Sequence, residues 1–144
     1  MSWRVLVIIA ASLAIGKAME NSGLAESIAH SLLGVITTPL LALVAMFVLT
    51  AGLSALISNV AAAVLLFPIA MAAALDLNVS PIPFAVIIMV AASASFATPI
   101  GYQTNLMVLG PGGYRFSDFL RMGIPLTVLV GVVAVFITPL IWPF

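Results

Sequence analysis

The sequence contains no cysteine and a single histidine, His30. A chain without cysteine forms no disulfide, iron–sulfur cluster or thiolate metal site, and a lone histidine excludes the His-rich sites that hold zinc and haem. The net charge is zero and no basic tract occurs, so we expect no nucleic-acid partner. Because neither a nucleophile–base pair nor a cluster of metal ligands is present, we also expect no enzyme activity.

Charged residues are also scarce in this sequence. They make up 6% of the chain, against about 25% in soluble domains, while 65% of the residues are hydrophobic. Uncharged runs cover 27–75, 77–114 and 122–144. A helix that spans a bilayer needs roughly 20 mainly apolar residues, so each of the first two runs is long enough for more than one helix. The composition therefore predicts an all-α polytopic membrane protein, with 1–144 forming a single membrane domain.

Proline, glycine and short polar clusters divide this domain into five segments. We expect a transmembrane helix at 3–20, an interfacial helix at 24–34, a helical hairpin at 39–75, a broken transmembrane helix at 82–112 and a last transmembrane helix at 118–141. Since the hairpin arms are joined only by Ser58 and Asn59, no loop is long enough to reach water. An arm of roughly 16 residues is about 24 Å long, short of the roughly 30 Å hydrocarbon layer. The hairpin is therefore predicted to be re-entrant, with its tip at 58–59.

The segment at 82–112 is interrupted in a matching way. The stretch "ATPIGYQTN", 97–105, places Pro99, Gly101 and several hydrogen-bonding side chains inside an otherwise apolar helix. Proline donates no backbone hydrogen bond and glycine loosens a helix, so we expect a break at 97–105. Two interrupted helices inside a bilayer are typical of the substrate and ion sites of secondary transporters.

Two interpretations of these polar residues remain open. A helix that begins at Asn59 directs free N–H groups toward the turn and suits an anion, while carbonyl groups near Ile57 suit a hard cation. Alternatively, small polar side chains hydrogen-bond neighbouring membrane helices as packing contacts, and this interpretation fits Ser54, Ser93 and Ser95 taken singly. The pair Ser58-Asn59, at a junction without a loop, favours ligand binding.

Basic residues indicate an orientation. If the segments at 3–20, 82–112 and 118–141 cross the bilayer, Arg4, Arg115 and Arg121 lie on one side and Lys17 on the other. The positive-inside rule then places the N-terminus in the cytoplasm and the C-terminus outside the cell membrane.

Several stretches together resemble the divalent anion/sodium symporters, which carry sulfate, dicarboxylates and tricarboxylates. These stretches are "ASLAIGKAMENSGLAESIA", "ISNVAAAVLLFPIA", "SASFATPIGYQTN" and "LGPGGYRFSDFLRMGIPL". The family fold has two inverted repeats, each with a re-entrant hairpin and a broken helix, and is a homodimer. Because the resemblance covers only the second repeat, it implies one inverted-repeat half of an ion-transporter-type fold, with the N-terminal half as a missing partner.

The resemblance also implies a ligand set. For a small anion, the implied contacts are Ser58, Asn59, Thr98 and Asn105. For sodium, the coupling ion, they are Ser54, Ile57, Asn59 and the carbonyl group of Ala97. No other cofactor is implied, and the choice among sulfate, dicarboxylate and citrate stays open. We therefore carry two hypotheses: the C-terminal part of a sodium-coupled anion transporter, or a non-transporting membrane fragment or assembly subunit that keeps the fold.

Overall fold

The computed structural model describes residues 38–100 and 102–144, together with the isolated positions 14, 18, 21–23, 27, 28 and 31. The side chains of residues 103 and 106 are not described. The expected transmembrane helix at 3–20 and the expected interfacial helix at 24–34 lie outside the described residues except at those isolated positions.

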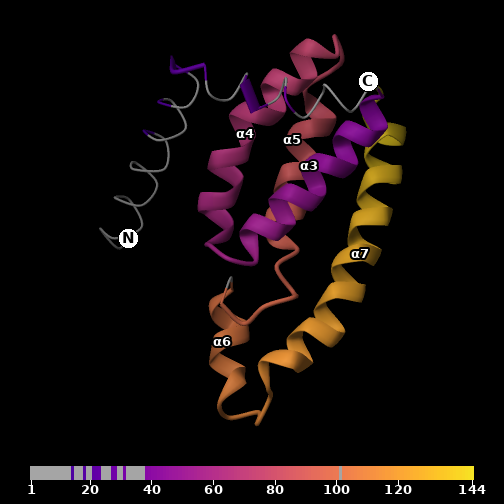
Figure 1. Ribbon diagram of the computed structural model, residues 1–144. Helices are drawn as coiled ribbons and strands as arrows, with labels where there is room; N and C mark the ends of the chain where they lie inside the picture. The colour runs from indigo at the N-terminus through magenta and orange to yellow at the C-terminus, as the bar shows by residue number, and fades with distance from the viewer. Residues whose placement is uncertain are drawn as a thin grey trace, which may run out of the picture.

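Helices make up the whole of the regular structure in the described part of the chain (Figure 1). They are α3 (Pro39–Ser54), α4 (Asn59–Asp76), α5 (Ile82–Ser93), α6 (Gln103–Leu109) and α7 (Phe116–Ile141). Helix α5 contacts α3, α4 and α7, and α3 also contacts α4 and α7. Helix α7 runs along one side of this bundle, from the turn after α6 at one end to the C-terminus at the other. The all-α prediction is confirmed, and α4 and α7 are long and apolar enough to span a membrane.

The centre of the bundle lies on α5. Phe84, Ile87 and Ile88 are at most 1% exposed and repeat at helical spacing, so that one face of α5 is enclosed by its neighbours. Leu43 and Met46 of α3 belong to the same cluster. A row of alanines on α4 and α5 completes it, which permits the close backbone approach typical of membrane helices.

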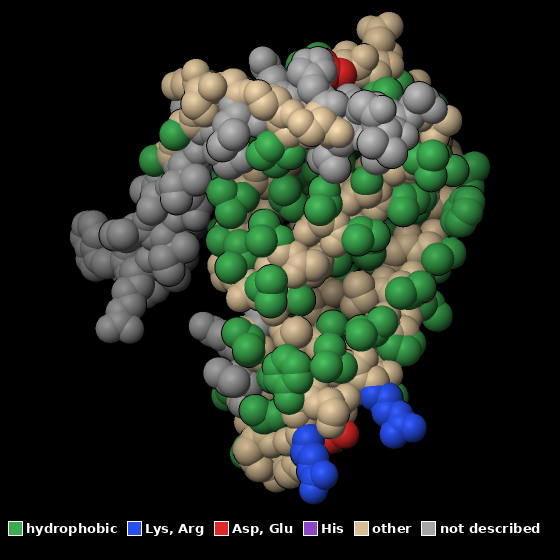
Figure 2. All heavy atoms as spheres, viewed as in Figure 1, with side chains coloured by type: hydrophobic (Ala, Val, Ile, Leu, Met, Phe, Trp, Pro, Cys, Tyr) green, Lys and Arg blue, Asp and Glu red, His purple; other side chains and the backbone are tan. Residues whose placement is uncertain are grey.

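Helix α7 carries the opposite kind of surface. Met122, Leu129, Phe136 and Leu140 are at least 60% exposed, and hydrophobic side chains cover this side of the molecule in Figure 2. Such an apolar exterior is suited to hydrocarbon rather than to water. The basic side chains of the described residues gather at the end of the molecule where α7 begins.

Two helix ends show why the chain turns where it does. At the end of α4, Asn78 adopts a left-handed conformation with φ 52°. The N–H groups of Asn78 and Val79 donate to the carbonyl oxygens of Leu75 and Ala74, which completes a Schellman motif. Helix α7 starts two residues before the expected position, because the carboxylate of Asp118 accepts a 2.7 Å hydrogen bond from the Arg115 N–H and caps the first turn.

Candidate binding site at the hairpin tip

The turn between α3 and α4 is formed by residues 55–58. The N–H of Ile57 donates to the carbonyl oxygen of Leu53 over 2.9 Å, which closes the last turn of α3. Ser58 then adopts an extended conformation, and its Oγ accepts a hydrogen bond from the Ala61 N–H over 3.3 Å. Ser58 is therefore the N-cap of α4, and Asn59 is its first residue.

The interruption after α5 covers residues 94–102, three residues earlier than the expected break at 97–105. Pro99 explains the shift. A proline in a helix lacks the N–H that would bond to the carbonyl oxygen of residue i−4, here Ser95, and its ring collides with that carbonyl group. The helix ends before this conflict, with Ala94 at φ −85° and ψ 36°. The freed carbonyl oxygen of Ser95 accepts a 3.3 Å hydrogen bond from Asn105 Nδ2 instead.

Four side-chain contacts at hydrogen-bond distance connect the hairpin tip with α5 and the break. Ser54 Oγ lies 2.6 Å from the carbonyl oxygen of Ala92 and 2.9 Å from Asn59 Oδ1. Ser95 Oγ donates to the same Asn59 Oδ1 over 3.1 Å. Thr98 Oγ1 donates to the carbonyl oxygen of Ala55. The two polar interruptions, more than 30 residues apart in the chain, therefore form one cluster with Asn59 at its centre.

Several polar groups at this contact keep unused bonding capacity. Asn59 Oδ1 accepts a hydrogen bond from Ser95 and also lies 2.9 Å from Ser54 Oγ, whereas Asn59 Nδ2 donates to no described residue. No described residue donates to the carbonyl oxygens of Ile57 and Ala97, and none accepts from the backbone N–H of Asn59 or Val60. The tip thus presents donors and acceptors side by side, since the N-terminus of α4 carries N–H groups and the end of α3 carries carbonyl groups.

The predicted site residues differ in their burial and in their hydrogen-bond partners. Ser54 is fully buried and Thr98 is 8% exposed, and both tie the tip to α5 and the break. Asn105 donates to the carbonyl oxygens of Ser95 and Thr98, so it closes the break itself. Ser58 is exposed and caps α4.

Sequence reasoning treated Ser95 only as a packing residue and did not identify Thr127. Ser95 orients Asn59, as described above. Thr127 Oγ1 of α7 donates to the carbonyl oxygen of Ala94 over 3.2 Å. Two features of the sequence point to these residues. Ser95 lies four residues before Pro99, and small residues spaced four apart along α7, at Gly123, Thr127 and Gly131, indicate a close helix contact.

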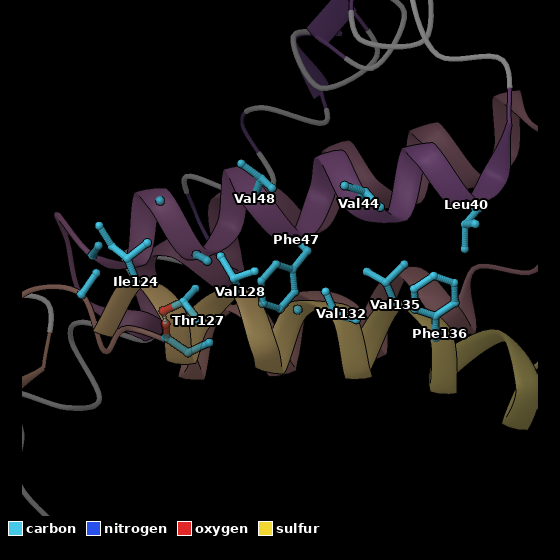
Figure 3. A pocket seen from close by; sticks show the side chains of 16 residues that line it. Leu40, Val44, Phe47, Val48, Ile124, Thr127, Val128, Val132, Val135 and Phe136 are labelled. Carbon is cyan, nitrogen blue, oxygen red and sulfur yellow. Dashed lines mark hydrogen bonds between the residues drawn. The ribbon is translucent and has the colours of Figure 1, made fainter. Parts of the chain in front are cut away.

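An apolar groove of about 400 Å³ runs between α3 and α7 beside this cluster (Figure 3). At one end Leu40 of α3 lies near Phe136 of α7, and toward the other end Val48 of α3 lies near Val128 of α7. Helices α3 and α7 are therefore antiparallel, with the hairpin tip directed toward the beginning of α7.

Comparison with known proteins supplies the family. A family model described as a citrate transporter, CitMHS, matches residues 1–144. The chain is 50% identical over 99 residues to the uncharacterized transporter YfbS of Escherichia coli, covering 69% of this chain and 16% of that protein. It is 38% identical over 138 residues to sodium/sulfate cotransporter 2 of Chlamydomonas reinhardtii, and the match covers 94% of this chain and 16% of that protein.

Solute carrier family 13 member 2 of Oryctolagus cuniculus is a more distant relative, 29% identical over 143 residues, covering 99% of this chain and 24% of that protein. The chain thus spans between about a sixth and a quarter of the length of these relatives. The resemblance to the divalent anion/sodium symporters is confirmed.

Proposed function

We propose that this chain, which belongs to the citrate transporter family, forms the C-terminal part of a sodium-coupled carrier of divalent anions, with the hairpin tip as half of the binding site. Membership of the family supports a role in membrane transport. The observation that carries the finer proposal is the cluster around Asn59, in which the amide oxygen faces the hydroxyl groups of two serines and the amide nitrogen has no described acceptor.

The anion is proposed to bind at the start of α4. Asn59 Nδ2 and the backbone N–H groups of Asn59 and Val60 are donors without a described acceptor. They lie at the N-terminus of an 18-residue helix, where the helix dipole adds a partial positive charge. Sulfate and carboxylate groups are acceptors that suit such donors. We propose Ser58, exposed beside them, as a further contact.

Sodium is proposed to bind on the carbonyl side of the same contact. The carbonyl oxygens of Ile57 and Ala97 accept no hydrogen bond from a described residue, and Ser54 Oγ keeps lone pairs after donating its proton. Neutral oxygens of this kind are ligands for a hard cation. Neither the tip nor the break contains a carboxylate, so a proton relay has no carrier among these residues.

The length of α7 supports the re-entrant arrangement, because the position of Thr127 along this helix gives the depth of the break in the bilayer. Thr127, which contacts the break, lies six residues after Arg121 and 14 before Ile141. At 1.5 Å per residue these separations are about 9 and 21 Å, so the break lies within the apolar layer if α7 spans it. The antiparallel α3 has 16 residues, about 24 Å, which matches entry from the side of the C-terminus and an end at this depth. By the positive-inside rule we propose that this side is outside the cell.

The test replaces the matching segment of Chlamydomonas sodium/sulfate cotransporter 2 with this chain. We call the product the hybrid transporter, and its reconstitution into proteoliposomes allows uptake of labelled sulfate, succinate and citrate to be measured with and without sodium. We expect sodium-dependent uptake of at least one of these anions. The variants Asn59→Ala and Ser58→Ala should abolish uptake while the protein still inserts. Ser93→Ala is the matched control, because Ser93 is exposed and bonds only within its own helix, to Met89.

The alternative hypothesis, a non-transporting fragment or assembly subunit, predicts a different result. A hybrid transporter that inserts and folds but takes up none of the three anions would support it. Loss of expression in Asn59→Ala equal to its loss of uptake would favour a packing role for Asn59. By the family resemblance we also propose that the complete protein includes an N-terminal half and is a homodimer, which crosslinking of the hybrid transporter in the bilayer would test.

A further inference from the structure

We infer that α7 positions the ion-binding part of the break, through Gly123 and Thr127, and so sets the apparent affinity for sodium. This inference rests on the proposed function, since it concerns the Ala97 carbonyl group proposed above as a sodium ligand. Neither α7 residue donates a hydrogen bond to any of the proposed ligand atoms. Both act on the backbone that carries one of them.

The break needs external support because it lacks a helical ladder. Ala94 leaves the helical conformation, and Pro99 has no N–H to offer. Side chains from other elements bond to the carbonyl oxygens that the helix no longer uses: Ser54 of α3 to Ala92, Thr127 of α7 to Ala94 and Asn105 of α6 to Ser95. The path of the backbone between Ala94 and Thr98 therefore depends on these contacts.

Thr127 supplies the only hydrogen bond from α7 to the break among the described residues. Its Oγ1 donates to the Ala94 carbonyl oxygen over 3.2 Å, from a half-buried position. Because this carbonyl group lies three residues before Ala97, its direction influences how the following peptide groups are oriented.

Gly123 fixes the same segment by contact. It is buried, and a Cβ at this position would overlap the carbonyl group of Phe96 and lie 2.6 Å from Cα of Ala97. The obstructing atoms are backbone atoms, which do not rotate away as the end of a side chain does. A larger residue at 123 must therefore displace the Phe96–Ala97 peptide, which is joined through the Cα of Ala97 to the carbonyl group proposed as the ligand. Since Gly123 and Thr127 are four residues apart, they form one face of α7 against the break.

Gly131 provides a matched control on the same face of α7. A Cβ there would lie 2.6 Å from an edge carbon of the Phe47 ring, which belongs to α3 and not to the break. The substitution Gly131→Ala thus disturbs the packing of α7 through a side chain of α3, and none of the three nearest obstructing atoms belongs to the break.

The first experiment measures sodium-dependent sulfate uptake by the hybrid transporter at varied sodium concentration. In Thr127→Val, which keeps the shape and removes the hydroxyl, we expect the half-saturating sodium concentration to rise about threefold to tenfold, the effect of one hydrogen bond. The rate at saturating sodium should change less than twofold. Thr127→Ser should restore the affinity of the parent, Gly123→Ala should raise the half-saturating concentration more than tenfold, and Gly131→Ala should leave it within twofold.

The second experiment measures amide hydrogen exchange on the same proteins and does not depend on transport. Exchange at 94–98 should quicken about threefold to tenfold in Thr127→Val and stay unchanged in Gly131→Ala. Unchanged exchange in Thr127→Val would overturn the bracing role of α7. Unchanged sodium affinity, or equal effects of Thr127→Ser and Thr127→Val, would overturn its role in positioning the ion site. If the parent hybrid shows no sodium-dependent uptake, the proposed function fails, and the exchange result still decides the bracing.

Discussion

The two serines that bond to Asn59 should respond differently when their hydroxyl groups are removed. Ser54 Oγ faces two acceptors, the Ala92 carbonyl oxygen at 2.6 Å and Asn59 Oδ1 at 2.9 Å, but it has one proton to donate. The shorter contact holds this proton, so Ser54 mainly joins α3 to α5. Ser95 Oγ has Asn59 Oδ1 as its acceptor at 3.1 Å and therefore mainly orients the amide.

The expected magnitudes follow from this division. Ser54 is fully buried, and Ser54→Ala leaves the Ala92 carbonyl oxygen without its interhelical donor. Interhelical hydrogen bonds in membrane proteins contribute about 0.6 kcal/mol on average and up to about 1.7. We expect the upper part of this range for the loss in unfolding free energy. Ser95→Ala should reduce stability by about 0.6 kcal/mol or less. Because it frees the Asn59 amide to rotate, it should raise the half-saturating anion concentration about threefold to tenfold.

Two measurements on the hybrid transporter test this separation: unfolding in detergent for stability, and sulfate uptake at saturating sodium for anion affinity. Ser93→Ala is the control for both, because Ser93 donates only to Met89 of its own helix. The reasoning is refuted if Ser54→Ala weakens anion affinity more than Ser95→Ala does, or if Ser95→Ala is the more destabilising change.

Two further predictions concern the helix ends. Asn78 has φ 52°, a left-handed conformation that valine adopts poorly and glycine adopts freely. Asn78→Val should therefore lower the unfolding free energy by about 1–2 kcal/mol, and Asn78→Gly should change it by less than about 0.5 kcal/mol. Equal effects of the two substitutions on unfolding in detergent would contradict the left-handed cap. The chain lacks cysteine, so Pro111→Cys and Phe144→Cys each introduce one exposed thiol at opposite ends of α7. A membrane-impermeant maleimide added outside cells should label the second variant alone, and labelling of both would refute the proposed orientation.

Local chemistry made much of the fold predictable from the sequence. Thr38-Pro39 marks the start of α3 because Thr38 accepts the Leu41 N–H and Pro39 needs no hydrogen-bond acceptor in the first turn. The Ser58-Asn59 junction marks the start of α4 for a similar reason. The expected break at 97–105 begins three residues later than the observed interruption at 94–102, because the sequence prediction extends the helix to Phe96. The steric effect of a proline reaches back four residues, to Ser95.

The contacts of α7 were not predictable in the same way. Gly123 and Thr127 pack on a segment about 30 residues away in the chain, and a pattern of small residues indicates a close helix contact without naming its partner. The role of Ser95 likewise depends on Asn59, which lies beside it because α3, α4 and α5 pack together. Tertiary packing, and not local propensity, decides which of several serines reaches the tip.

The sequence leaves open whether the polar residues are packing contacts or ligands, and we propose that these two roles divide by atom and not by residue. The hydroxyl groups of Ser54, Ser95, Thr98 and Thr127 all donate to protein acceptors, and no buried side-chain polar atom of the described residues lacks a partner. Through their protons these hydroxyl groups make packing contacts, while the lone pairs of Ser54 Oγ stay available for the proposed sodium site. The packing contacts hold the backbone in a path that leaves the carbonyl oxygens of Ile57 and Ala97 without described donors. Inside a bilayer such groups are costly unless protein, water or a ligand satisfies them. The packing contacts therefore keep these carbonyl oxygens free to bind a ligand. Removing one contact should alter the affinity for the ligand, because the backbone that the contact holds would move.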